Sequence, residues 1–284
     1  MSPPTAPLPV SDLGRAVDRP ARVTEVLDLG AGSWELVLAC PEIAARARPG
    51  EFLQVQVDPA PVPLLRRPFS VCWADPASGA LGIYFGVTGI GTARLAGLAV
   101  GDAVRVLGPL GRGYTLPPGP ATTLCVAGGL GAAPFPFLAR ALTAAGATVR
   151  WLNGAASADR LYPIERLGAP VTAAVVTQDG SRGRPGVVTD ILPGLLAGAD
   201  RVYACGPNPM LAAVADVCAA APTPVALEVS LEAPMGCGFG TCLGCALPVR
   251  GPEALALCCR QGPVLPADAV DWPALLALPP AHVA

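Results

Sequence analysis

Five of the ten cysteines of this 284-residue chain lie in one glycine-rich stretch near its C-terminal end. Cys237, Cys242 and Cys245 follow a C-x4-C-x2-C spacing, and the pair Cys258-Cys259 begins thirteen residues after Cys245. Three thiolates within nine residues cannot be paired off as ordinary disulfides, but they can surround one polynuclear centre. This spacing is that of plant-type [2Fe–2S] ligation. The pattern therefore predicts a [2Fe–2S] cluster held by these three cysteines and one of the later pair.

The later pair leaves the fourth ligand open, since both Cys258 and Cys259 could reach the cluster. The plant-type fourth ligand normally lies further along the chain, so this short return is a departure from the pattern. A zinc knuckle is the alternative, but zinc sites prefer C-x2-C pairs at both ends. Glycines at 236, 238, 240 and 244 let the backbone curl and present N–H groups to the sulfurs, which favours iron–sulfur.

A second set of residues carries the chemistry of flavin binding. Arg67-Pro68-Phe69-Ser70 opens an expected strand, and Gly89-Ile90-Gly91-Thr92 follows at an expected helix start. An Arg can pair with a pyrophosphate as a planar fork, and free N–H groups at a helix start bind phosphate. The two motifs together predict a flavin site, against the alternative of a plain barrel with ordinary turns.

A third set predicts a nucleotide site. Gly128, Gly129 and Gly131 stand at a junction between a strand and a helix, where a dinucleotide phosphate can approach the backbone closely. Cys205-Gly206-Pro207 follows another buried strand. Both could instead be ordinary turns at strand ends. No acidic residue is clearly placed for the adenosine ribose, so the choice between NAD and NADP stays open.

Composition excludes several other chemistries. All nineteen basic residues are Arg, and His282 is the only His. Lysine Schiff bases, a phosphate-loop Lys and a Ser-His-Asp nucleophile are therefore excluded. The net charge of −2 and the absence of a basic stripe argue against nucleic acid, and no apolar run is long enough to span a membrane. Without an apolar signal-peptide core, a cytoplasmic location is expected.

The secondary-structure elements that must position these residues follow two different patterns in two parts of the chain. Six short expected strands, at residues 23–29, 33–39, 52–57, 69–73, 81–87 and 103–107, indicate an antiparallel β-barrel. Strands at 123–127, 148–152, 171–177 and 201–204 then alternate with helices at 133–145, 188–196 and 209–220. Such alternation is typical of a parallel α/β sheet that binds nucleotides.

The expected organisation is therefore a multidomain α+β chain. It consists of a flexible leader (1–20), an FAD-binding β-barrel (21–117), an α/β NAD-binding-like domain (118–223), a small [2Fe–2S] domain (224–268) and a surface tail (269–284). The remaining cysteines at 40, 72, 125 and 218 read as buried thiols.

Residues 21–265 resemble the electron-transfer subunits of class 1B dihydroorotate dehydrogenase, within the ferredoxin–NADP reductase superfamily. The resemblance rests on motifs spread along the chain: Arg66–Ser70, Gly91-Thr92, Leu107–Gly111, Gly128–Pro134, Thr177–Ser181 with Gly186, Cys205–Pro207, Leu231-Glu232 and Cys259–Val264. It implies FAD contacts at Arg67, Pro68, Phe69, Ser70, Tyr84, Phe85, Gly86, Gly91 and Thr92. It also implies that Cys205 faces the nicotinamide and favours Cys259 as the fourth ligand.

Two positions depart from the family pattern. Near Gly86 relatives commonly have a basic residue, and Ala156 stands where relatives often carry Arg after the Gly-Ala pair. The first departure affects one of the implied flavin contacts, and the second is expected to weaken nucleotide binding.

The resemblance implies electron transfer in pyrimidine (UMP) biosynthesis. Electrons would come from an FMN-containing, dihydroorotate-oxidising partner, through [2Fe–2S] and FAD to NAD+, in a heterotetramer of two plus two subunits. No side-chain acid or base is required, and no catalytic residue is expected. A subunit of another NAD(P)-linked oxidoreductase, of ferredoxin–NADP, sulfur or hydrogenase type, is the alternative. A non-redox zinc or nucleotide-binding module is the third reading.

Overall fold

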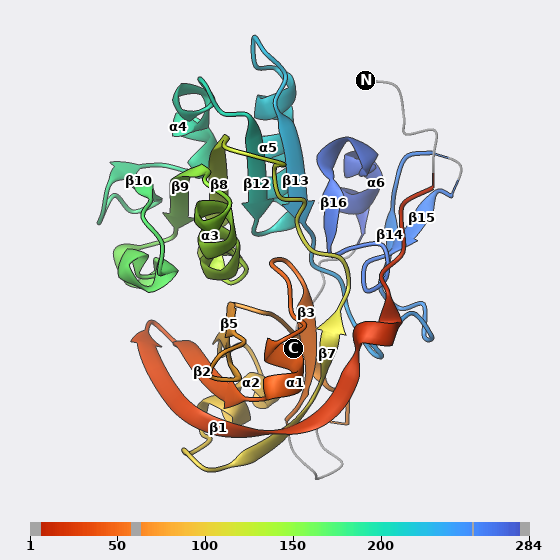
Figure 1. Cartoon of the computed structure of the whole chain (residues 1–284). Coiled ribbons are helices and arrows are strands. Elements are labelled where there is room, and N and C mark those ends of the chain that lie inside the picture. The colour runs from red at the N-terminus through yellow and green to blue at the C-terminus, as the bar shows by residue number, and fades with distance from the viewer. Residues whose placement is uncertain (1–6, 58–63, 252, 279–284) are drawn as a thin grey trace.

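Two seven-stranded sheets and a small hairpin organise the molecule (Figure 1). The computed structural model describes residues 7–57, 64–251 and 253–278. The described helices are α1 (Pro41–Ala44), α2 (Ile90–Ala96), α3 (Phe135–Ala144), α4 (Val188–Leu195), α5 (Asn208–Ala219) and α6 (Trp272–Ala277). Short 3-10 turns lie at Leu13–Arg15, Gly129–Ala132, Ala158–Arg160, Ile164–Leu167 and Ala267–Ala269.

The first sheet is antiparallel and has the strand order β4-β3-β7-β1-β2-β6-β5. Its strands are β1 (Val17–Gly30), β2 (Ser33–Ala39), β3 (Phe52–Gln56), β4 (Arg67–Ser70), β5 (Trp73–Asp75), β6 (Ala80–Gly86) and β7 (Ala103–Leu110). The edge strands β4 and β5 are consecutive in the chain, so the sheet curls back toward itself around a core that includes Leu36, Leu53 and Ile83. This half-barrel confirms the expected antiparallel flavin-type fold.

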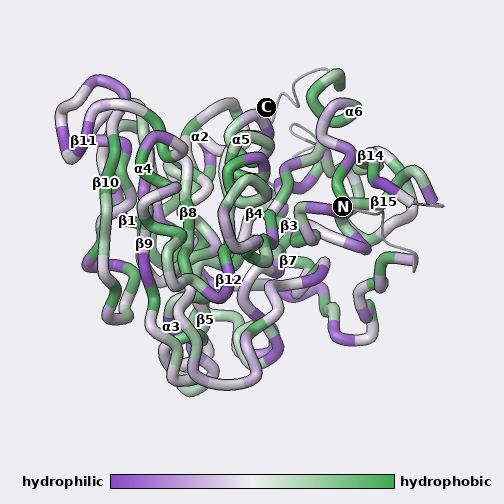
Figure 2. Tube along the Cα trace, turned by 90° about the horizontal axis from the view of Figure 1, so that it is seen from above, coloured by the Kyte–Doolittle hydropathy of each residue, from purple (hydrophilic) through white to green (hydrophobic). Residues whose placement is uncertain are grey.

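The second sheet has the order β11-β10-β9-β8-β12-β13-β16. Its strands are β8 (Thr122–Gly128), β9 (Thr148–Ala155), β10 (Thr172–Thr177), β11 (Arg184–Pro185), β12 (Arg201–Cys205), β13 (Ala226–Ser230) and β16 (Val264–Pro266). All pairings are parallel except β13 with β16. Both faces are buried: Leu124 and Val126 pack toward α4 and α5, whereas Cys125 packs toward α3. Figure 2 shows the hydrophobic colouring that runs through these central strands.

The cysteine-rich segment is not a separate body. Strands β13 and β16, which flank it, both pair within the second sheet, and only β14 (Ala246–Pro248) and β15 (Leu255–Leu257) form the two-stranded hairpin. The expected boundary at residue 224 therefore does not coincide with a break in the sheet.

Three expectations need correction. The expected strand at 69–73 is two strands, because the chain turns between Ser70 and Trp73 to change sheet edges.

Within the expected flexible leader, residues 1–6 lie outside the described part, but β1 already begins at Val17. The N–H of Ser11 donates to the carbonyl of Arg260 at 2.8 Å, and Arg15 pairs with the buried Glu51 at 2.6 Å. These contacts hold the leader against the body of the protein.

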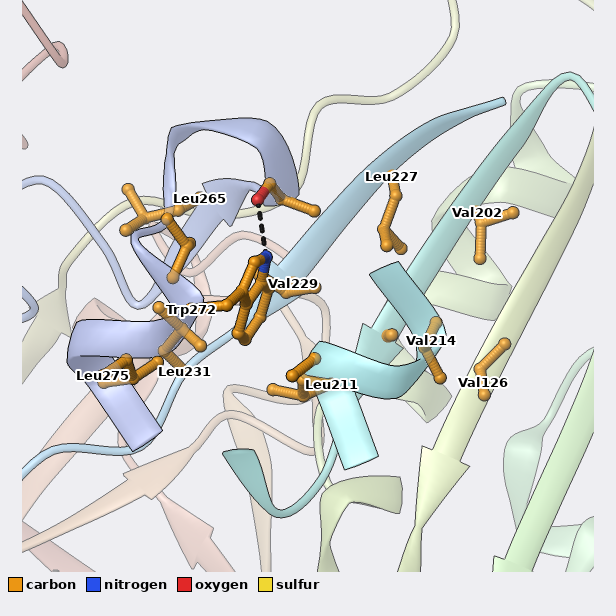
Figure 3. Close-up of a cluster of buried hydrophobic side chains, with 14 of the residues drawn as sticks. Val126, Val202, Leu211, Val214, Leu227, Val229, Leu231, Leu265, Trp272 and Leu275 are labelled. Carbon is orange, nitrogen blue, oxygen red and sulfur yellow. Dashed lines mark hydrogen bonds between the residues drawn. The ribbon is translucent and has the colours of Figure 1, made fainter. Parts of the chain in front are cut away.

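The expected surface tail is part of the core. Trp272 of α6 is 8% exposed, and its ring lies between β13 and α5 beside Leu211 and Val229 (Figure 3). Its indole N–H donates to the carbonyl of Ala267 at 3.0 Å. The expectation was based on the Pro/Ala-rich composition, which does not reveal that Trp272 and Leu275 form a buried apolar face on this short helix. Residues 279–284 lie outside the described residues.

Candidate functional site

The cysteine loop, residues 235–245, connects β13 to β14 without regular structure. Gly238 and Gly240 have φ of 83° and 93°, a left-handed conformation that side chains other than hydrogen rarely adopt. The loop returns against Cys259, whose sulfur lies 3.1 Å from the sulfur of Cys245. Cys242 is exposed and Cys237 is half-buried. The spacing of glycines thus produces the tight turns that bring distant thiols together.

Three of these thiols have strongly shifted pKa values. The hydrogen bond with Cys259 lowers the pKa of Cys245 to about 6, and the same bond, with burial, raises the pKa of Cys259. Burial works to raise the pKa of Cys237, but backbone N–H groups of Cys242 and Phe239 outweigh it and lower that pKa to about 7. Because the thiolate is the form that binds metal, the lowered pKa values of Cys237 and Cys245 favour metal binding by these two thiols.

Cys258 and Cys259 point to different places. Both residues are buried in the same hydrophobic core, but the Cys258 thiol lies 3.5 Å from the carbonyl of Leu231. Cys259 faces Cys245 instead. Of the two alternatives that the spacing leaves open, the geometry therefore supports Cys259 as the partner of the cysteine loop.

The four cysteines form two pairs. Cys245 lies against Cys259, and Cys237 shares a hydrogen bond with Cys242. Within the described residues, no three His, Cys, Asp or Glu side chains gather as a single metal ion would need. A [2Fe–2S] cluster has two irons and takes four protein ligands, so two pairs of thiols match the ligand set of such a cluster.

A cavity of about 660 Å³ lies between the barrel and the second sheet. It is lined by nine residues that the sequence motifs single out: Pro68, Phe69, Ser70, Tyr84, Phe85, Gly86, Thr92, Gly131 and Cys205. The strand order explains this gathering, since β4 and β6 both end at the side of the barrel that meets the ends of β8 and β12. Burial raises the pKa of the Cys205 thiol to about 12, so this thiol is protonated at neutral pH.

Arg67 and Gly91 adjoin this cavity rather than line it. The Nε atom of Arg67 would lie 3.1 Å from a Cβ placed on Gly91, so the guanidinium packs directly against the start of α2. This Nε is buried and has no hydrogen-bond partner in the described structure, although Nη1 donates to the carbonyl of Leu65 at 2.9 Å. An Arg with a buried, unpartnered Nε beside the start of a helix fits a pyrophosphate, which supports the flavin interpretation.

The side chains of Tyr84, Phe85 and Thr92 also hold the cavity together. The Thr92 hydroxyl accepts the N–H of Thr88 at 2.9 Å and of Gly89 at 3.2 Å, which fixes the turn before α2. Tyr84 packs edge-on against Tyr162 of the second half of the molecule, with ring centroids 4.9 Å apart. The Phe85 ring packs 5.4 Å from that of Phe69.

A second cavity of about 740 Å³ adjoins the first, at the carboxyl ends of the parallel strands. Its lining includes all the glycines of the first strand–helix junction, together with Gly154, Gly206 and Pro207. At Gly131 a Cβ would collide with the carbonyl of Cys205, and at Gly128 with the sulfur of Met210. Gly131 is therefore required by close packing against backbone, whereas Gly128 packs against a side chain. Ligands bind at this edge of open α/β sheets.

The two cavities share a wall. Gly86, Thr88, Leu130, Gly131 and Glu232 line both. A Cβ on Gly86 would lie 2.7 Å from the end of the Leu130 side chain, so Gly86 packs directly against this residue of the shared wall. Burial raises the pKa of Glu232.

The second cavity has one cationic residue among the described residues that line it, Arg160, and one anionic residue, Glu232. Ala156, the other departure, also lines it. Arg160 lies four residues after Ala156 on an exposed 3-10 turn, and sequence motifs gave no signal for it. Sequence reasoning likewise missed Glu35, a buried carboxylate of β2. It accepts from the indole N–H of Trp73 at 2.7 Å and pairs with Arg166 of the 3-10 turn Ile164–Leu167 at 2.8 Å. The described residues include no helix with the length and apolar character needed to cross a bilayer.

Comparison with solved structures supports this architecture. A chain of an NADH-dependent reduced ferredoxin-NADP oxidoreductase, studied for flavin-based electron bifurcation, matches with a TM-score of 0.81 at 27% identity, over 90% of this chain and 91% of that one. The ferredoxin reductase of carbazole 1,9a-dioxygenase shares the fold, with a TM-score of 0.61 at 20% identity over 71% of this chain and 64% of that one.

Comparison of sequences is more specific. Residues 232–271 match the family model of the iron-sulfur cluster binding domain of dihydroorotate dehydrogenase B. The electron transfer subunit of dihydroorotate dehydrogenase B (NAD(+)) from Geobacillus kaustophilus is 39% identical over 241 residues, which covers 84% of this chain and 92% of that relative. The subunit of the same name from Shouchella clausii is 38% identical, over 87% of this chain and 96% of that relative. The chain therefore belongs to the family of electron transfer subunits of dihydroorotate dehydrogenase B.

Proposed function

We propose that this chain carries electrons from a dihydroorotate-oxidising partner to NAD+ and so serves pyrimidine biosynthesis. The observation that carries the proposal is the continuity of three sites. The segment after β13 passes from Glu232, in the wall common to both cavities, through Ala233 and Met235 in the smaller cavity to Cys237. A group bound at each site would therefore adjoin the next. FAD supplies the exchange between hydride and single-electron transfer, which makes such a series useful.

The four cysteines in two pairs, Cys237 with Cys242 and Cys245 with Cys259, are the proposed ligands of the [2Fe–2S] cluster. Backbone N–H groups of the cysteine loop already lower the pKa of Cys237, and the same groups would donate to cluster sulfurs. Cys258 is not among them, because its thiol lies against the carbonyl of Leu231 whereas Cys259 lies against Cys245.

The smaller cavity is the proposed FAD site. Arg67 and the start of α2 at Gly91 and Thr92 would hold the pyrophosphate. The β4 and β6 residues Pro68, Phe69, Ser70, Tyr84, Phe85 and Gly86 would surround the ring system. The larger cavity would take NAD(H) over Gly128, Gly129, Gly131, Gly206 and Pro207. Cys205, which lines the smaller cavity, would stand where the two ligands meet. Arg160 would supply the positive charge that Ala156 lacks.

The catalytic partner is proposed to contain FMN, and the assembly to be a heterotetramer of two plus two subunits in the cytoplasm. The names of the relatives support a partner, because an electron transfer subunit requires one. We also propose that residues 21–117, 118–223 and 224–268 act as the flavin, nucleotide and cluster units.

The first test is composition and activity of the full chain purified without oxygen. We expect one FAD and two irons per chain, and NAD+ reduction when the dihydroorotate-oxidising partner and dihydroorotate are added. A colourless chain loaded with zinc would contradict the proposal. Mixing the loaded chain with partner and measuring NADH absorbance checks the whole transfer, and omission of dihydroorotate is the control.

A second candidate is a subunit of a ferredoxin-linked NAD(P) oxidoreductase. The high structural similarity to a chain of the reduced ferredoxin-NADP oxidoreductase favours it. Iron and FAD would be present under both proposals. A chain that exchanges electrons with ferredoxin, but not with a dihydroorotate-oxidising partner, would support the second candidate over the first.

A further inference from the structure

Gln54 of β3 is a wholly buried amide, with 0% of its surface exposed. Neither its Nε2 nor its Oε1 has a hydrogen-bond partner within the described structure. Buried polar groups in folded proteins are nearly always hydrogen-bonded, and each exception calls for an explanation. An unmet partner, such as a bound group that the chain itself does not supply, is one such explanation.

The Gln54 side chain points away from the barrel core. Its neighbours Leu53 and Val55 face that core, so alternation along the strand turns Gln54 to the opposite face. There it meets the cysteine loop: a Cβ on Gly238 would lie 2.6 Å from Cγ and 2.9 Å from Nε2 of Gln54. The amide therefore packs against the residue that follows Cys237, a proposed cluster ligand.

Strand β3 also reaches the flavin cavity. Phe52, two residues before Gln54, lines that cavity and pairs with Ser70 of β4. One short strand of the barrel thus contacts both the proposed FAD site and the proposed cluster loop. Gln54 is the polar side chain of this strand that faces the loop at Gly238.

The other side of the cysteine loop carries Arg260. Its Cγ would lie 2.8 Å from a Cβ on Gly240, and its Nη2 donates to the carbonyl of Ser11 at 3.1 Å. The Nε of Arg260 is buried and unpartnered in the described structure, but the guanidinium is already anchored through Nη2. Gln54 has no such anchor among the described residues, so both polar atoms of its amide remain available to a group bound at the cysteine loop.

We propose that Gln54 is a positioning residue that donates an amide N–H to the sulfur atoms held by the cysteine loop and thereby raises the reduction potential of the cluster. This inference rests on the proposed function. Reduction adds one negative charge to the cluster, and hydrogen bonds to its sulfurs stabilise that charge. The flavin barrel, not the cysteine loop alone, then sets how readily the cluster accepts an electron.

The test uses the full chain with its FAD and cluster. Gln54→Met keeps the length of the side chain and removes both amide N–H groups. Gln56→Met makes the same change on the same strand, at a position paired in register with Arg105. Redox titration followed by the electron paramagnetic resonance of the reduced cluster gives the midpoint potential, and its g-values report on the surroundings of the sulfurs.

We expect Gln54→Met to lower the reduction equilibrium constant of the cluster about tenfold, or ~59 mV for one electron, with shifted g-values. The FAD potential and the Gln56→Met cluster should match the wild type. An unchanged cluster potential in an iron-loaded Gln54→Met chain would overturn the inference.

A second variant covers the case in which Gln54→Met does not assemble a cluster. Gln54→Asn keeps the amide but shortens the side chain by one methylene, so a lowered potential supports the inference and an unchanged one overturns it. A wild-type chain without iron would instead contradict the proposed function itself, which keeps the two failures distinct.

Discussion

The cysteine loop and the second sheet hold the same residue type in opposite states. In the loop, backbone N–H groups and a neighbouring thiol lower the pKa of Cys237 to about 7 and of Cys245 to about 6. In the sheet, burial raises the pKa of Cys125, and of Cys205 to about 12. The difference shows that hydrogen bonds from loop N–H groups and a neighbouring thiol favour the thiolate, whereas burial within the sheet favours the protonated thiol.

The sharpest test of this contrast lies in two adjacent residues. Cys259→Ser should abolish cluster assembly, because Cys259 faces Cys245, whereas Cys258→Ala should keep full iron content. The second change should cost about 1–2 kcal/mol of stability through the small cavity it leaves. Iron analysis and thermal unfolding of both variants give the answer. Iron loss in the Cys258 variant alone would reverse the assignment.

Removal of the iron offers a second test of the contrast. In the chelated chain, iodoacetamide should modify Cys237 readily at pH 7, where about half of this thiol is ionised. The rate should fall as the pH drops below its pKa of about 7. Cys205 should stay unmodified, since its thiolate fraction is on the order of 10⁻⁵ and the thiol is buried. Peptide mass spectrometry measures both sites, and equal labelling would break the comparison.

The rigidity of the sheet predicts a third outcome. Gly131→Ala should cost about 3 kcal/mol of stability and weaken NADH binding, because the added methyl collides with the carbonyl of Cys205. Gly119→Ala is the matched control, since a Cβ there meets open space. Thermal unfolding and the KM for NADH check both changes. Unchanged values in Gly131→Ala would show that the strand ends can move apart.

At the flavin cavity we expect a smaller effect, a loss of affinity for FAD. Arg67→Met should weaken FAD binding about 10–100-fold, the value of a charge-assisted hydrogen bond of about 1.5–3 kcal/mol. The control Arg184→Met removes an exposed Arg of β11 in the second sheet. Fluorescence titration of the FAD-stripped chain measures the affinity. An unaffected Arg67→Met chain would place the pyrophosphate elsewhere.

Local patterns in the sequence predicted the family and the fold class, and both are confirmed. The cysteine spacing, the strand–glycine–helix junction at Gly128 and the Arg67–Ser70 motif all act within a few residues, so they can be read without a structure. Strand β2 lies where alternation predicts it, at residues 33–39. The cysteines and the flavin and nucleotide residues remain proposals as ligands and contacts.

Only the tertiary structure decided what joins these local features. Gln54 meets Gly238, Glu35 pairs with Arg166, and Glu232 stands in a wall common to two cavities. The first two contacts join residues that are more than a hundred positions apart. The choice between Cys258 and Cys259 also needed the packing of the hairpin against β13. Sequence periodicity reports which face of an element is buried, but not against which distant partner, because that depends on how the sheets pack.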